Sequence, residues 1–168
     1  MFLIYTTLGP MNKKKSVLFV CTGNICRSPT AEAYFRDAIR RGGLEAQFHH
    51  DGAGIDSHHI GHPPDVRSQA VLRAAGIEMN DLRARNVRPQ DFYDFDLILA
   101  MDDTHLKALK KMAPADAKAE VALYLPYCHG TGNDGVPDPY YGGDEDFLKV
   151  LHMIRDATPL LVAKLQSK

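Results

Sequence analysis

A short apolar run, SVLFV at residues 16–20, leads into the loop CTGNICR and then into a helical pattern over residues 29–41. β-branched and aromatic residues in a run of this length are typical of a buried strand. Ser28 suits the N-cap of the helix, Pro29 its first turn, and Gly42 its end. The segment therefore predicts a strand, a tight loop and a helix, the first unit of an α/β fold.

The same alternation continues along the chain. Further strands are predicted at residues 46–50, 96–100 and 120–125, of which the first has the weakest pattern. Further helices are predicted at residues 64–75, 104–111 and 144–165. Pro159 lies inside the last helical pattern and is expected to kink or split it. Strands that alternate with helices indicate a parallel sheet with helices on both faces, so we expect an α/β three-layer sandwich.

Composition excludes several classes of protein. The chain has 168 residues, enough for one domain with its own core, and no apolar run long enough to cross a bilayer. Its 20 basic and 21 acidic residues argue against a general nucleic-acid binder. Three cysteines, an odd number, do not make a secreted disulfide framework, so a reducing, cytoplasmic location is expected, with neither nucleic acid nor membrane as a partner.

The first fifteen residues differ from the rest of the chain. MFLIYTTLGP is apolar but short, and lysines follow it, which is the wrong order for a signal peptide. Met11 offers an alternative start. We therefore expect residues 1–15 to be a dispensable or flexible extension and residues 16–168 to form a single domain.

The loop at residues 21–27 carries the strongest chemical signal. In parallel sheets, ligands bind beyond the carboxyl ends of strands, where backbone N–H groups and a helix N-terminus attract anions. Arg27 adds a planar fork for two phosphate-like oxygens, and Cys21 is expected to ionise there and act as a nucleophile. An inert buried thiol and a surface arginine are the alternative. The position of the pair between a strand and a helix favours the functional interpretation.

Four segments together resemble one family. CTGNICRSPTAE (residues 21–32), IGHPPD (60–65), DFDLILAMD (94–102) and DPYYG (138–142) look like the low-molecular-weight protein tyrosine phosphatases and occur in the expected order. The resemblance implies a central four-stranded parallel sheet, no metal or other cofactor, and hydrolysis of phosphotyrosine through a cysteinyl-phosphate intermediate. Phosphotyrosine proteins or small aryl phosphates would be substrates, inorganic phosphate a product or inhibitor, and the protein a monomer or weak dimer.

Expulsion of a tyrosyl oxygen needs a general acid, because the leaving phenol has a pKa of about 10. Asp138 lies in the Pro- and Gly-rich segment VPDPYYGG, where an ordinary turn aspartate is the alternative. The match of DPYYG to the family favours Asp138 as the acid.

The resemblance also suggests smaller roles. Asn24 and Ser28 would brace the loop, Asp102 would support the site, and Cys26 would form a reversible disulfide with Cys21, although a loop-filling thiol is the alternative. Phe48 is expected as an aromatic at the pocket mouth, although the family's usual Ser-Ala pair near it is Gly52-Ala53 here. The expected substrate-binding residues are Thr22, Gly23, Asn24, Ile25, Cys26, Ser28, Phe48, Tyr140 and Tyr141.

Two other patterns are interpreted as surface loops. HHDGAGIDSHHIGH (residues 49–62) contains five histidines but lacks a standard metal-ligand spacing. HGTGNDG (residues 129–135) lacks the Lys-Ser/Thr ending of a nucleotide-binding loop, and Cys128 before it is expected to be structural.

Three alternatives to a tyrosine phosphatase stay open. A thiol-dependent arsenate reductase would need further cysteines well after the loop, and residues 27–127 contain none. A phosphoarginine phosphatase would carry a small polar residue where this chain has Ile25. A noncatalytic phosphotyrosine-binding module would not need both Cys21 and Asp138.

Overall fold

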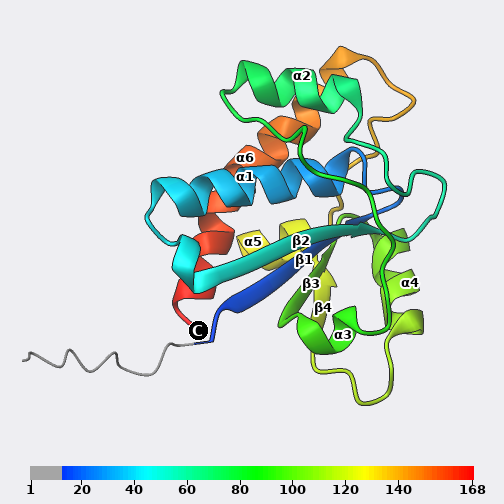
Figure 1. The fold of residues 1–168 in the computed structure, drawn as a ribbon, viewed down its shortest axis with the longest axis vertical. Coiled ribbons are helices and arrows are strands. Elements are labelled where there is room, and N and C mark those ends of the chain that lie inside the picture. The colour runs from blue at the N-terminus through cyan, green and yellow to red at the C-terminus, as the bar shows by residue number, and fades with distance from the viewer. Residues whose placement is uncertain (1–12) are drawn as a thin grey trace, which may run out of the picture.

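Four parallel strands form the centre of the fold in the computed structural model, which describes residues 13–168 (Figure 1). They are β1 (Lys15–Cys21), β2 (Phe48–Gly54), β3 (Leu97–Ala100) and β4 (Glu120–Leu123). The strand order is β2-β1-β3-β4, and every neighbouring pair is parallel. The expected four-stranded parallel sheet is confirmed. Residues 1–12, most of the predicted extension, lie outside the described residues.

Helices cover both faces of this sheet (Figure 1). On one face, alternate β1 residues such as Phe19 pack with Phe35 of α1 and Ile154 of α6. On the other face, Leu18 packs with Phe92 of α3 and Leu109 of α4. The three-layer prediction is therefore confirmed. The helices are α1 (Arg27–Arg41), α2 (Val66–Ala74), α3 (Asp91–Asp94), α4 (Asp103–Met112), α5 (Tyr124–His129) and α6 (Asp144–Gln166), with a 3-10 turn at Glu45–Gln47.

The structure corrects several predicted boundaries. α1 begins at Arg27 with Cys26 as its N-cap, so Ser28 lies inside the helix. The strand predicted at residues 120–125 ends at Leu123, and α5 begins immediately afterwards. α6 runs unbroken through Pro159, so the expected split is wrong. Burial of Ile154, Thr158 and Leu161 against the core holds the helix together across the missing backbone donor.

The carboxyl ends of the strands define one edge of the sheet. Cys21 ends β1 beside Gly54 of β2, and Met101, which follows β3, accepts a hydrogen bond from the backbone of Val136 at 2.7 Å. This bond attaches the segment between α5 and α6 to the same edge. No helix within residues 13–168 is long and apolar enough to cross a membrane.

Candidate active site

A pocket of about 420 Å³ opens at the carboxyl edge of the sheet. It brings together Cys21, Arg27 and Asp138, which the sequence assigned to catalysis. Its lining also includes Thr22, Gly23, Ile25, Cys26, Asp56, His58, His59, Tyr140 and Tyr141.

The loop between β1 and α1 is held by hydrogen bonds among its own side chains. Sγ of Cys21 lies 3.0 Å from Oγ of Ser28, and Nδ2 of Asn24 donates to the same Oγ at 2.7 Å. Asn24 adopts a positive φ of 56°, a conformation that asparagine tolerates better than most residues. The loop therefore turns sharply into α1 and keeps the thiol next to a hydroxyl that can donate to it.

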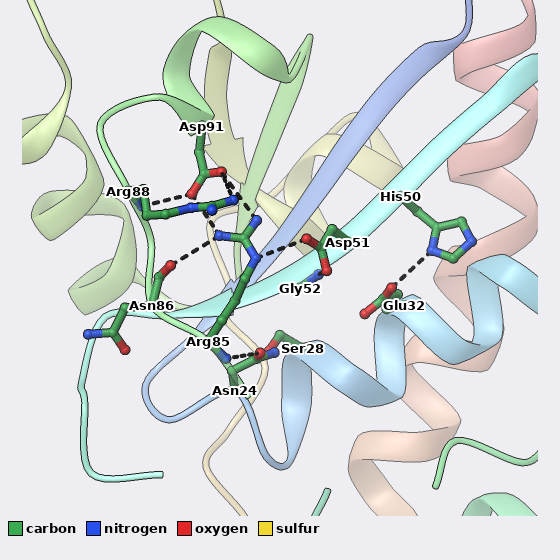
Figure 2. A network of polar contacts seen from close by, with 10 residues as sticks. All are labelled: Asn24, Ser28, Glu32, His50, Asp51, Gly52, Arg85, Asn86, Arg88 and Asp91. Carbon is green, nitrogen blue, oxygen red and sulfur yellow. Dashed lines mark hydrogen bonds and ion pairs between the residues drawn. The ribbon is translucent and has the colours of Figure 1, made fainter. Parts of the chain in front are cut away.

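A second set of hydrogen bonds and ion pairs, made by Arg85, holds the Asn24 side chain in place (Figure 2). The backbone N–H of Arg85 donates to Oδ1 of Asn24 at 3.2 Å, and the Arg85 guanidinium contacts Asp51 and Asp91 at 2.9 and 3.0 Å. A Cβ on Gly52 would lie 2.8 Å from Nδ2 of Asn24. Gly52 therefore leaves room for the loop amide of Asn24.

Arg27 lies almost fully buried, with 2% of its surface exposed. Its Nη1 donates to Oδ2 of Asp102 at 2.7 Å and to the carbonyl of Val136 at 3.0 Å. Nη2 donates to Oγ1 of Thr22 at 3.2 Å and lies 3.6 Å from Oδ2 of Asp138. Burial opposes ionisation of Asp102, but hydrogen bonds from Arg27 and from the His105 backbone outweigh it and lower the pKa of that carboxyl.

His105 is a buried residue of this site that the sequence analysis missed. It lies in the first turn of α4, where its Nδ1 accepts the Asp102 N–H at 3.2 Å and its Nε2 lies 2.8 Å from Oγ1 of Thr22. Burial, followed by the positive charge of Arg27, lowers the pKa of His105 to about 4. The pair Asp-x-x-His after a strand was a possible signal, because it matches a reciprocal cap at a helix start.

Asp138 extends from the segment between α5 and α6. Its Oδ1 accepts the backbone N–H of Tyr140 at 3.1 Å, and its side chain is 45% exposed. The rings of Tyr140 and Tyr141 lie 4.9 Å apart, and the guanidinium of Arg67 lies 5.5 Å from the Tyr140 ring. Asp138 and the two tyrosines therefore occupy one side of the pocket entrance.

The expectation for Phe48 is wrong. Phe48 begins β2 and pairs with Lys15, so it lies at the opposite end of the strand from Cys21, and its ring packs on Phe35. Two residues of the histidine-rich segment lie at the entrance instead. His59 packs directly over Gly23, where an added Cβ would approach its ring to 2.8 Å, and His58 lines the same pocket.

All three cysteines are free and buried. Burial raises the pKa of the Cys26 thiol to about 12, with Asp65 and Cys21 as further causes, and burial raises that of Cys128 to about 12. Within residues 13–168, no three side chains of the metal-binding types lie close enough together to hold a metal ion.

Comparisons with known proteins agree with this geometry. The family model described as low molecular weight phosphotyrosine protein phosphatase matches residues 16–168. The low molecular weight protein-tyrosine-phosphatase of Bacillus subtilis is 43% identical over 91% of this chain and 97% of its own length. The human low molecular weight phosphotyrosine protein phosphatase is 41% identical over 79% of this chain and 84% of its own length.

Solved structures give the same result. A protein tyrosine phosphatase from Entamoeba histolytica superimposes with a TM-score of 0.85 and 36% identity, covering 92% of this chain and 98% of its own. A crystal structure of the Bacillus subtilis protein also gives 0.85, at 42% identity, covering 92% and 96%. The chain therefore belongs to the low molecular weight phosphotyrosine protein phosphatases, and its activity is the hydrolysis of phosphotyrosine, a phosphoric monoester.

Proposed function

We propose that Cys21, Arg27 and Asp138 perform this hydrolysis in two steps through a phosphocysteine intermediate. The observation that carries the proposal is that one pocket is lined by all three residues, although Asp138 comes from a segment far along the chain. Nη2 of Arg27 lies 3.6 Å from Oδ2 of Asp138, so the phosphate clamp and the carboxyl meet over the thiol loop.

In the first step the thiolate of Cys21 attacks phosphorus, and the P–O bond to the tyrosyl oxygen breaks. The Asp138 carboxyl gives its proton to that oxygen, and the phenol departs. Oγ of Ser28, 3.0 Å from Sγ, stabilises the thiolate by donating a hydrogen bond. In the second step the Asp138 carboxylate takes a proton from water, the water oxygen attacks phosphorus, and the S–P bond breaks to release phosphate and the thiolate.

Arg27 and the loop backbone hold the phosphoryl oxygens during both steps. Nη1 is engaged by Asp102 and Val136 and one hydrogen of Nη2 by Thr22, so the Nε–H and the second hydrogen of Nη2 remain for substrate. The N-terminus of α1 adds backbone N–H groups and a positive dipole end. These fixed donors do the work of a metal ion, so no cofactor is proposed.

The pocket walls favour an aryl phosphate on a protein. Tyr140 and Ile25 offer apolar surface to a phenyl ring, and phosphotyrosine proteins or small aryl phosphates are the proposed substrates. An arginine phosphatase of Drosophila has a similar structure, with 33% identity and a TM-score of 0.82. Ile25 argues against phosphoarginine as the substrate here. The buried thiols of Cys26 and Cys128, each with a pKa near 12, argue against an arsenate reductase relay.

A reducing, cytoplasmic location is proposed on the chemistry of the cysteines. The mechanism needs a reduced Cys21, and all three thiols are unpaired in the structure.

Rapid acid quenching tests the mechanism directly. The enzyme is mixed with a peptide carrying [³²P]phosphotyrosine, and the trapped protein is digested and mapped. Label is expected on Cys21 in the wild type and in a Cys128→Ser control, and none is expected in Cys21→Ser. Label on another residue, or turnover by Cys21→Ser, would contradict the covalent mechanism.

A further inference from the structure

Thr22 and His105 make a polar contact that the proposed catalytic roles leave unused. Nε2 of His105 lies 2.8 Å from Oγ1 of Thr22. Thr22 is an exposed loop residue that lines the pocket, whereas His105 is 2% exposed and packs beside the Arg27–Asp102 pair. The buried ring therefore contacts an open hydroxyl next to the phosphate loop.

Hydrogen bonds define which ring nitrogen of His105 carries the proton. The Asp102 N–H donates to Nδ1 at 3.2 Å, so Nδ1 presents its lone pair. Oδ1 of Asp102, which accepts the backbone N–H of His105 at 3.1 Å, also lies 3.2 Å from Nδ1, but a hydrogen on Nδ1 would face the hydrogen of the Asp102 N–H. A neutral imidazole has one ring hydrogen, which is then on Nε2. Burial and the nearby Arg27 charge keep the ring neutral.

The Nε2–H of His105 therefore donates to Oγ1 of Thr22. Nη2 of Arg27 donates to the same oxygen at 3.2 Å and lies 3.5 Å from Nε2 of His105, the spacing of two donors that share one acceptor. A hydroxyl has two acceptor lone pairs and one hydrogen. Because both lone pairs of Oγ1 face donors, its hydrogen is directed away from His105 and Arg27.

We propose that His105 is a positioning residue that fixes the Thr22 hydroxyl as a hydrogen-bond donor to a phosphoryl oxygen of the substrate. The inference rests on the proposed function, because it adds a donor to the same phosphate site. A donor held in place before substrate binds needs no reorganisation when negative charge arrives, and a hydrogen bond to an anion is stronger than a neutral one. Without the ring, the hydroxyl hydrogen rotates among several directions.

Binding of inorganic phosphate tests this inference without requiring turnover. The affinity is measured by calorimetry and by competition against nitrophenyl phosphate for Thr22→Val, His105→Met and the double variant. Each single variant should bind phosphate about tenfold more weakly, which corresponds to about 1.4 kcal/mol. The double variant should be no weaker than Thr22→Val alone, because both changes act through one hydroxyl.

Conservative variants separate positioning from a merely structural role. His105→Gln keeps an amide N–H able to reach Oγ1 and should recover most of the affinity that His105→Met loses, and Thr22→Ser should do the same for Thr22→Val. His152→Met, on the exposed face of α6, is the matched control and should bind phosphate like the wild type.

Three outcomes would overturn the inference. Thr22→Val could bind phosphate as tightly as the wild type, the two single losses could multiply in the double variant, or His105→Met could lower the melting temperature without weakening phosphate binding. In each case the wild type still binds phosphate, so the proposed function stands. A wild type that does not bind phosphate would overturn both.

Discussion

Nη1 of Arg27 and Oδ2 of Asp102 form an ion pair of 2.7 Å between residues 75 positions apart in the chain. The Arg27 side chain is 3% exposed and that of Asp102 is 30% exposed, so a buried guanidinium is paired with a carboxylate that is partly open to solvent. Asp102 has a second function, because its Oδ1 accepts the His105 N–H and caps α4. One carboxylate thus fixes both the arginine and the helix that carries His105.

Substitution of Asp102 separates these two functions. Asp102→Asn keeps a good N-cap but removes the charge that orients Arg27, so kcat/KM should fall about tenfold or more. Asp102→Ala should lose activity similarly and should also unfold more easily than Asp102→Asn, by about 1 kcal/mol in urea titrations. Equal stability of the two variants would contradict the capping role, and wild-type kcat/KM in Asp102→Asn would contradict the orienting role.

His105 should make the stability of the protein depend on pH below neutrality. The folded protein protonates His105 only near pH 4, whereas the unfolded chain does so near its ordinary pKa of 6.5. Between these values the unfolded state holds more protons, so stability from this residue is complete above pH 6.5 and is lost as pH falls toward 4.

Urea unfolding of the wild type and of His105→Gln from pH 4 to 8 measures this effect. The free energy of unfolding of the wild type should fall more steeply below pH 6.5, by up to about 1.4 kcal/mol per pH unit from this group. His105→Gln should be flatter over that range and parallel to the wild type above it. Parallel curves over the whole range would show that His105 is not buried in its neutral form.

The sequence predicted the sheet well where strands are apolar. Residues 16–20 and 97–100 are buried on both faces, and such apolar runs have few other interpretations. β2 was predicted poorly, at residues 46–50 in place of Phe48–Gly54, because its histidines and glycines lack the usual strand composition. The direction in which β2 runs beside β1 decides where Phe48 lies. That direction depends on pairing between two segments that are distant in the chain, so no local sequence pattern indicates it.

In the candidate site, too, local sequence predicted some residues, whereas others depend on packing between distant segments. The thiol and the arginine lie on one loop between a strand and a helix, so local sequence places them together. His58 and His59 line the pocket, and His105 contacts Thr22 of the loop, because separate segments of the chain pack against that loop. Nothing in the spacing of His58 and His59 indicates that they reach the pocket, and the histidine-rich segment was therefore interpreted as an ordinary surface loop.

The three thiols should differ in their reaction with iodoacetamide at pH 7. Cys26 and Cys128 stay protonated, because burial raises the pKa of each to about 12. Only Cys21 should be labelled, with loss of activity, and inorganic phosphate should slow its labelling. Intact mass and peptide mapping measure this, and Cys21→Ser should stay unlabelled. Labelling of Cys26 at a similar rate would contradict its protonated state, because Cys26 also lines the pocket.

The role of Asp138 predicts a dependence on the leaving group. If Asp138 protonates the departing oxygen, Asp138→Asn should slow phosphorylation of Cys21 by phosphotyrosine by about 100-fold or more. A nitrophenolate leaves with far less help, so phosphorylation by nitrophenyl phosphate should slow much less. Burst experiments are needed, because Asp138 is also proposed to activate water in the second step, which can limit steady-state turnover on good substrates.

Asp134→Asn is the matched control for Asp138→Asn, because Asp134 is an exposed carboxylate of the same segment and does not line the pocket. It should leave both burst rates unchanged. Nη2 of Arg27 lies 3.6 Å from Oδ2 of Asp138, and Arg27 is proposed to hold the substrate phosphate, so a loss of phosphate positioning would slow both substrates equally. Equal slowing of phosphotyrosine and nitrophenyl phosphate in Asp138→Asn would therefore assign Asp138 to positioning, and another carboxyl at the entrance, such as Asp56, would have to supply the proton.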